Sequence, residues 1–277
     1  MVCAGNKTKL IVIATDQMRR SRFKNQKMTV TVCDATIEDT KSEKLLGLTI
    51  NNKLTWKEYL YGEAWRSENN ARGLISQLSQ RAGILAKIAP IMPTHRFKQI
   101  CSGLFYSKLI YCIQIFGNVW DIPSFDDLNR RTQAFTKEDN RKLQVLQNKI
   151  LRLKTGLPFE TSTASLLQNS GDLSVQQLTA YTSLVTAQKS ILHQEPVYLA
   201  EKFKKNQSLH SHKVTPPNYT LSVSRDGFFY RTASLYNLLP TSLSSETNPE
   251  VFKKRVKPWI ASNIPIKPGD RYHVMSW

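Results

Sequence analysis

Basic residues gather near the start of this 277-residue chain. Residues 16–26, which we expect to form a loop between two strands, contain Arg19, Arg20, Arg22 and Lys24 but a single acid. Arginine side chains match the geometry of phosphate oxygens and lysine supplies a point charge, so the cluster predicts contact with a phosphate backbone. The alternative is an exposed turn without a partner. Because the charges are clustered and acids are scarce, we favour phosphate contact.

A second set of cations falls on two stretches whose apolar residues recur at helical spacing. Taken as a set, these cations could line a groove that accepts a nucleic acid duplex. For each residue alone, a long side chain on a solvated helix face explains the position equally well. The first stretch carries Arg66, Arg72, Arg81 and Lys87, and the second carries Arg96, Lys98 and Lys108.

The charge of the whole chain points the same way. Its 39 Lys and Arg outnumber 21 Asp and Glu, which gives a formal net charge of +18. The commonest physical reason for such a balance is a polyanionic partner, most often nucleic acid, because neutralised phosphates release their counterions. Basic character that serves solubility alone is the alternative.

Several other chemistries lack a motif. The four cysteines (Cys3, Cys33, Cys101, Cys112) form no CxxC pair, so we expect neither a disulfide scaffold nor a zinc ribbon, and a reducing compartment. The sequence shows no Ser/His/Asp arrangement and no Walker-type glycine loop, which leaves hydrolase and nucleotidase functions without support.

Metal binding has two weak candidates in the sequence. The only Asp-Asp pair, Asp126-Asp127, follows Pro123 in a polar connection, and we interpret it as a solvated loop or a helix cap. His193, His210 and His212 have no cysteine nearby and fall in or beside a linker-like stretch. We therefore predict no metal site in this chain.

Aromatic residues among the cationic helices have two interpretations. They could stack on bases or on a primer sugar. Most recur at helical spacing, which favours core packing. The residues concerned are Tyr59, Tyr61, Trp65, Phe105, Tyr106 and Tyr111.

The elements that must position these residues form an α+β fold, with short strands first and helices after. Apolar, β-branched runs predict strands at 10–14 and 28–32 and a further pair at 35–37 and 44–50, where Gly47 suggests a bulge or a close backbone approach. These short strands are too few to form a complete sheet. They therefore indicate the edge of a larger domain. Helices are predicted within 71–85, 93–116, 143–153, 163–169, 174–193 and 251–260.

Composition refines this organisation. Between Phe159 and Ala200 only Lys189 is basic apart from histidine, so we expect a packing layer there rather than a phosphate-facing surface. Residues 204–224 resemble a linker. The apolar stretch from Gly103 to Trp120 carries polar residues and is shorter than the roughly 20 clean residues of a bilayer span. We therefore expect no membrane partner and an intracellular location, cytoplasmic or nuclear.

Six short motifs follow one another along the chain. They are K-T-K before an apolar strand (7–12), L-L-G-L-T-I-N-N-K-L-T-W (45–56), L-S-Q-R-A-G (78–83), Y-S-K-L-I-Y (106–111), G-N-V-W (117–120), and R-T-A-S-L-Y-N-L-L-P with F-K-K-R-V-K (231–257). Their order resembles the carboxy-terminal third of a non-LTR, LINE-like retrotransposon reverse transcriptase of the jockey type. The family usually has Trp where this chain has Tyr236.

The resemblance implies roles for particular residues. Lys7 would act as general acid toward the departing pyrophosphate, and Leu46 and Gly47 would lie on a primer-grip hairpin. The implied organisation is a remnant of the palm edge with the hairpin (1–54), a helical thumb (55–135), a helical connector (136–203), a linker (204–224) and a small basic unit (225–277).

The sequence departs from the family in its carboxylates. Polymerisation needs two divalent ions held about 3.5–4 Å apart by acidic side chains, and the family places these side chains before the K-T-K strand. Only six residues precede Lys7 here, and none is acidic. We therefore expect a fragment that binds RNA or an RNA–DNA hybrid without polymerising, with Mg²⁺ belonging to the absent palm and the rest of a reverse transcriptase as a further partner.

Two alternatives belong to other classes. The chain could be a stand-alone basic nucleic-acid-binding or helical assembly protein derived from a decayed element. It could also be a helical adaptor for protein partners that uses the neutral block between Phe159 and Ala200. Salt dependence separates them, because only a polyanion binder loses affinity steeply as salt rises.

Overall fold

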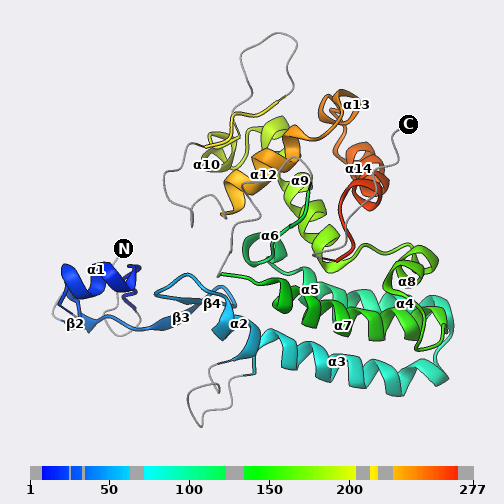
Figure 1. The fold of residues 1–277 in the computed structure, drawn as a ribbon, viewed down its shortest axis with the longest axis horizontal. Coiled ribbons are helices and arrows are strands. Elements are labelled where there is room, and N and C mark those ends of the chain that lie inside the picture. Colours follow the sequence, from blue (N-terminus) through cyan, green and yellow to red (C-terminus); the bar gives the residue numbers. More distant parts are fainter. Residues whose placement is uncertain are drawn as a thin grey trace. The chain divides into compact units, whose positions relative to one another are not determined.

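The computed structural model describes residues 8–24, 26–32, 35–62, 72–122, 134–203, 213–217 and 227–267 (Figure 1). These residues form a mixed α+β structure that is mainly helical, with two small antiparallel sheets. The chain divides into two compact units. The first is Met1–Gln77 with Gln133–Phe135, and the second is Leu78–Thr132 with Thr136–Trp277.

In its described part, the first unit has two sheets of two antiparallel strands each. Leu46 and Gly47 turn the chain between the strands of the second sheet, with φ values of +47° and +85°. Positive φ at both central residues is the signature of the type I′ hairpin turn. The prediction of a single strand over 44–50 is therefore wrong, because a turn divides this stretch into two strands, while the strand predicted over 35–37 is present. The observed pairs are β1 (Thr29–Val32) with β2 (Ala35–Glu38), and β3 (Ser42–Leu45) with β4 (Leu48–Asn51).

A short helix forms within residues 16–26, where the sequence predicted a basic loop. The α1 helix (Asp16–Ser21) begins because the Thr15 side chain accepts a hydrogen bond from the Met18 N–H at 3.2 Å. Asp16 lies in its first turn and its arginines in the last, which matches the helix dipole. The strand predicted over 10–14 is reduced to a single parallel bridge between Leu10 and Asp39.

Asn51 joins the second sheet to the helix that follows it. This residue is 4% exposed, and its amide donates to Thr55 Oγ1 at 2.6 Å and to Glu58 Oε2 at 2.5 Å. Its side-chain oxygen accepts from the Thr55 N–H at 2.8 Å. The α2 helix (Lys57–Tyr61) is thereby held against β4, because a buried amide must find partners.

The second unit is mainly helical in its described residues. Three of its helices agree closely with the predictions for 143–153, 163–169 and 174–193. The elements are α3 (Leu74–Ile88, whose first residues belong to the first unit), η3 (Ala89–Ile91), α4 (Thr94–Cys101), η4 (Ser102–Tyr106), α5 (Ser107–Ile110), α6 (Ile113–Phe116), α7 (Lys137–Thr155), α8 (Thr163–Ser170), α9 (Val175–His193), α10 (Val197–Ala200), α12 (Phe228–Asn237), α13 (Thr241–Ser244) and α14 (Pro249–Asn263).

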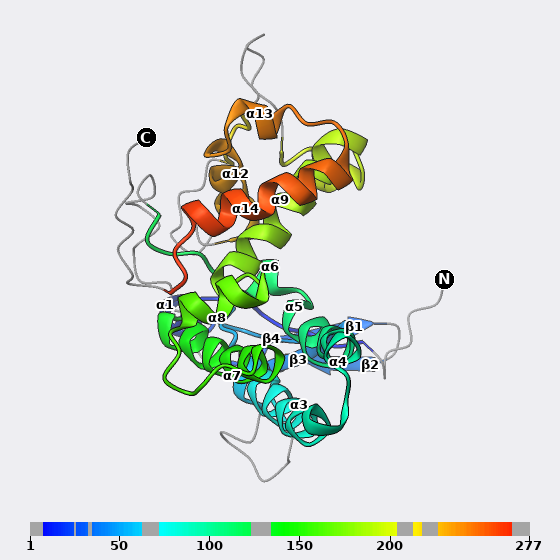
Figure 2. The same cartoon turned by 90° about the vertical axis from the view of Figure 1, so that its right-hand side faces the viewer.

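The α9 helix forms the centre of the second unit (Figures 1 and 2). It packs against α5, α6, α7, α10, α12 and α14. Gly117, just after α6, approaches it so closely that a Cβ there would lie 2.6 Å from Thr179 Oγ1. The neutral block therefore is a packing layer, as its composition predicted. Residues predicted as connector and as C-terminal unit share this core.

Buried glutamines fix the segments between helices. Each uses a neutral amide to bond backbone outside its own helix, which satisfies polar groups that burial would otherwise leave unpaired. The bonds run from Gln147 Nε2 to Leu173 O (2.7 Å), Gln176 Nε2 to Trp120 O (2.9 Å), Gln177 Nε2 to Ile264 O (2.9 Å), Gln188 Nε2 to Glu246 O, and from the Val175 N–H to Gln144 Oε1 (2.9 Å).

The helix predicted over 93–116 is interrupted twice. Residues 102–106 form a π-helical turn, and Cys112 has a left-handed φ of +57° between α5 and α6. Cys101 and Cys112 therefore do not lie on one helix, contrary to the prediction. The apolar stripe nevertheless stays buried, with Phe97, Phe105 and Leu109 at most 2% exposed.

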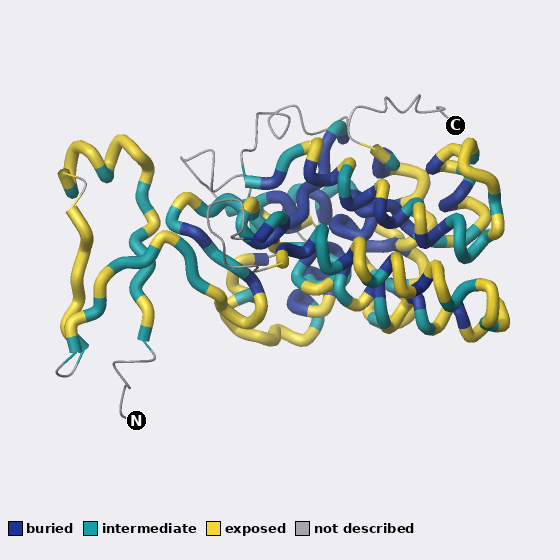
Figure 3. The backbone as a smooth tube through the Cα atoms, turned by 90° about the horizontal axis from the view of Figure 1, so that it is seen from below, coloured by how far each residue is buried: buried dark blue, intermediate teal, exposed yellow. Residues whose placement is uncertain are grey.

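Burial differs along the chain. Every residue of β1, β2 and β3 is half-buried or exposed. Buried residues concentrate in the helices (Figure 3). Within the described ranges, no helix combines the length and the apolar character needed to cross a bilayer.

Candidate nucleic-acid interface

Arg19 points inward rather than toward solvent. Its guanidinium donates to Val12 O at 2.5 Å and lies 3.5 Å from a carboxylate oxygen of Asp39. The side chain is 22% exposed and that of Asp39 only 8%. Arg19 therefore joins α1 to the segments around the Leu10–Asp39 bridge, a role that suits the several donors of a guanidinium.

The other three cations of the amino-terminal cluster are exposed. Arg20 donates to the Asp16 carbonyl at 3.3 Å within its own helix. Arg22 caps the end of α1, and neither it nor Lys24 makes an ion pair with a described residue. Asp16 is paired with Lys53 at 3.0 Å, and this hydrogen bond lowers the pKa of the Asp16 carboxyl. The exposed charge at this end of α1 is thus positive.

The β3–β4 hairpin presents an apolar tip. Leu45 is 60% exposed and Leu46 is 83% exposed. Large apolar side chains at a two-residue turn have little to pack on in their own hairpin. Leu46 and Gly47, which the resemblance assigned to a primer grip, are therefore displayed outward by the turn.

Arg81 is also engaged in holding the structure together. It donates from α3 to the Leu104 carbonyl at 2.6 Å and so ties α3 to the π-helical turn η4. Lys108 is half-buried on α5, and Arg72 is exposed just before α3. Lys7 and Arg66 lie outside the described residues, as do Trp65, Asp126, Asp127, His210 and His212.

Three predicted cations surround the corner between α3 and α4. Lys87 lies in the last turn of α3, and Arg96 and Lys98 lie on α4. All three are exposed, and none is ion-paired with a described residue. Lys98 also lines a small polar cavity of about 230 Å³ together with Lys154 and Asn169.

The sequence around this corner lacks acids altogether, a signal that inspection of single cations missed. From residue 72 to residue 120 there are six Lys or Arg and no Asp or Glu. No carboxylate of this stretch can therefore neutralise the exposed cations at the corner. A helical surface of this kind attracts phosphates over a distance set by ionic strength.

A half-buried ion pair joins α7 to the segment before α9. Lys154 of α7 pairs with Asp172 and sits 5.2 Å above the Tyr106 ring, while the Tyr106 hydroxyl donates to Asp172 at 3.1 Å. Burial first, and the Asp172 charge second, raise the pKa of Tyr106. Burial also raises the pKa of the Cys101 thiol to about 11. These groups stay protonated at neutral pH and stabilise the core rather than react.

Two of the cations on the carboxy-terminal basic helix form ion pairs with nearby acids. In α14, Lys253 pairs with Glu250 at 2.6 Å and Arg255 with Glu246 at 3.2 Å. Lys257 donates to the Gly171 carbonyl at 2.7 Å. Lys254 is exposed and makes no ion pair with a described residue.

Metal ligation finds no support among the described residues. They contain no group of three or more His, Cys, Asp or Glu side chains able to hold an ion together. His193 is exposed at the end of α9.

Comparisons with protein-family models, with curated proteins and with solved structures found no match to this chain.

Proposed function

We propose that this chain binds template–primer nucleic acid, an RNA duplex or an RNA–DNA hybrid, through the phosphate backbone, as the gripping part of a retrotransposon reverse transcriptase. The observation that carries the proposal is the acid-free stretch 72–120 with Lys87, Arg96 and Lys98 exposed at the α3–α4 corner. Phosphate contacts of this kind supply affinity without reading sequence.

The motif order described above supplies the family in this proposal. Two features of the first unit support it. The β3–β4 hairpin displays Leu46 at its tip, as a part that touches a primer would. Each sheet has only two strands among the described residues, and such sheets need further strands or a covering layer for stability. Strands from the rest of a reverse transcriptase would supply them.

We do not favour the alternative that the chain is an adaptor for protein partners. It depends on the neutral block between Phe159 and Ala200 being a docking face. Most of α9, which forms the larger part of that block, is buried against neighbouring helices. A buried helix offers little surface to a protein partner.

Charge reversal at the corner tests the proposal. We expect the triple variant Lys87→Glu, Arg96→Glu, Lys98→Glu to weaken binding to unrelated hybrid sequences alike, and to lower the slope of log affinity against log salt by about 3. Fluorescence polarisation over a salt series measures both quantities. The matched control reverses Lys149, Lys189 and Lys202, three exposed lysines elsewhere, which changes the net charge equally.

The two variants separate a located interface from general attraction. A loss confined to the corner variant supports the proposal. Equal losses in both variants would mean that net charge alone attracts nucleic acid. If the wild-type chain binds no hybrid at low salt, the proposed function is wrong.

A further inference from the structure

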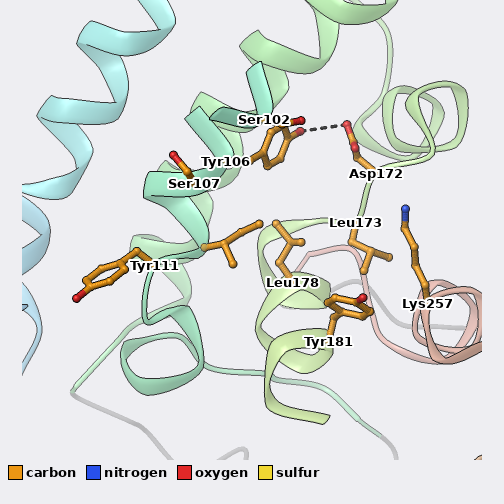
Figure 4. A pocket seen from close by; sticks show the side chains of 10 residues that line it. Ser102, Tyr106, Ser107, Tyr111, Asp172, Leu173, Leu178, Tyr181 and Lys257 are labelled. Carbon is orange, nitrogen blue, oxygen red and sulfur yellow. Dashed lines mark hydrogen bonds between the residues drawn. The ribbon is translucent and has the colours of Figure 1, made fainter. Parts of the chain in front are cut away.

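A cleft opens in the second unit beside the α14 helix. The proposed function assigns no role to this helix. It has a volume of about 510 Å³ and lies among η4, α5, the segment around Leu173, α9 and α14. In Figure 4, Tyr181 and Leu178 project from α9, and Lys257 extends from α14 toward Asp172. The volume falls within the range of about 300–1,000 Å³ that is typical of ligand pockets.

A second cavity adjoins the cleft along α14. It has a volume of about 660 Å³, shares Asp172, Leu173 and Lys257 with the first and extends past Pro258 and Ala261. The two cavities therefore adjoin at these three residues, and we refer to them together as the groove. Two adjoining cavities suit a chain-like ligand, which can place one group in each, better than a compact small molecule.

The groove carries positive charge. Asp172 is the only acid among its described lining residues, and Lys154 and the Tyr106 hydroxyl already occupy it. Lys257 gives one N–H to the Gly171 carbonyl and keeps two donors. Lys254, which makes no ion pair with a described residue, precedes Lys257 by one helical turn, whereas Lys253 is already paired with Glu250. The ligand that complements this wall is anionic.

Tyr181 gives the groove an aromatic surface. Its side chain is half-buried beside Leu178, and its hydroxyl makes no hydrogen bond with any residue in the described ranges. Burial raises the pKa of Tyr181, so the hydroxyl stays a neutral donor. An aromatic face next to a lysine is the combination on which single-stranded nucleic acids bind, with a base stacked and a phosphate paired.

We infer that this groove binds single-stranded nucleic acid, with a base against Tyr181 and a backbone phosphate at Lys257. The inference rests on the proposed function, since it assigns to α14 an unpaired strand of the same template–primer partner. It adds a contact that duplex binding at the α3–α4 corner does not require.

The test compares a blunt RNA–DNA hybrid with the same hybrid carrying a single-stranded extension. We expect the wild-type chain to bind the extended hybrid about tenfold more tightly, and Tyr181→Leu and Lys257→Gln each to remove most of that gain. Affinity for the blunt hybrid should not change. Tyr181→Phe keeps the ring, and Lys189→Gln removes an exposed cation of α9 that does not line the groove, so both should retain the gain.

Photo-crosslinking keeps the test decisive if Tyr181→Leu fails to fold. An extension that contains 5-iodouridine should crosslink to the peptide that carries Tyr181 in the wild-type chain. Crosslinks confined to other peptides would overturn the inference. So would displacement of the extension by poly-glutamate at matched charge, which would show that the groove takes an acidic peptide.

Failure of the inference can be told from failure of the proposed function. Equal affinity for blunt and extended hybrids, unchanged by Tyr181→Leu, overturns the groove assignment and leaves duplex binding standing. Absence of binding to the blunt hybrid at low salt overturns the proposed function itself.

Discussion

The two compact units bury their side chains to very different degrees. In the first unit, β1 has only intermediate and exposed residues, and Val30 is 46% exposed. In the second unit, α9 alone buries twelve residues. Because apolar burial is the main favourable contribution to folding, the β1–β2 sheet gains less stability from its own side chains than α9 does. The exposed cations of the α3–α4 corner therefore belong to the unit with the more extensive buried core.

Arginines show a related contrast. Arg19 and Arg81 each donate to a backbone carbonyl outside their own helix, whereas Arg20, Arg22 and Arg96 are exposed. A guanidinium has enough donors to link segments, so a sequence rich in arginine does not by itself describe a binding surface. The exposed subset is the part available to phosphates.

The largest expected effect is a core truncation in the second unit. Phe105 is fully buried and packs edge-on against Tyr106 at 5.6 Å. Phe105→Ala should lower the free energy of unfolding by about 3–5 kcal/mol, measured by urea unfolding. Val30→Ala on β1 should change it by less than about 0.5 kcal/mol. Similar losses in the two variants would contradict the contrast between the units.

The half-buried Lys154–Asp172 ion pair gives the next effect. Asp172→Asn leaves Lys154, whose side chain is 7% exposed, without its counterion. We expect a loss of about 2–3 kcal/mol, because the Lys154 ammonium is largely buried and would lack its counterion. A double-mutant cycle with Lys154→Met measures the coupling, and a coupling near zero would show that the pair contributes no stability.

Alkaline pH should destabilise the second unit. Burial raises the pKa of Tyr236 to about 12, and its hydroxyl donates to Gln188 Oε1 at 2.6 Å. The raised value means that stability is full below pH 10, the pKa of an unfolded tyrosine, and falls as pH rises toward 12. The loss should be on the order of 2 kcal/mol. Tyr236→Phe, measured by urea unfolding at each pH, should show a shallower decline, and an equal decline would refute this assignment.

The smallest effect concerns the hairpin of the first unit. Gly47→Ala forces a side chain onto a φ of +85° and should cost about 1 kcal/mol. Amide hydrogen exchange should accelerate over β3 and β4 while α9 keeps its protection. The control is Gly83→Ala on α3, where a Cβ meets nothing within 4 Å, and which should stabilise the helix by about 0.5–1 kcal/mol. Acceleration in α9 as well would mean that the units do not unfold separately.

Much of the helical architecture could be predicted from the sequence. The ends of α7 follow from Thr136 with Asp139 in a capping box and from Gly156 at a left-handed φ of +70°. The Ser174–Gln177 capping box likewise opens α9. These signals are local, so no tertiary information is needed to interpret them.

Other elements depended on contacts that periodicity does not reveal. Phe97, Cys101, Phe105 and Leu109 recur every four residues, and an ordinary α-helix of 3.6 residues per turn would rotate such a stripe away from one face. The wider π turn at 102–106 reduces this drift, so the strict spacing was a signal for it. The inward turn of Arg19 and the grouping of Tyr181 with Lys257 arise from residues far apart in sequence, which spacing alone cannot show.

The buried glutamines have a practical consequence. Amides carry no charge at any accessible pH, so the bonds from Gln147, Gln176 and Gln177 to interhelical backbone do not weaken when counterions crowd the surface. The purified chain should therefore keep these loop anchors when it is washed in concentrated salt.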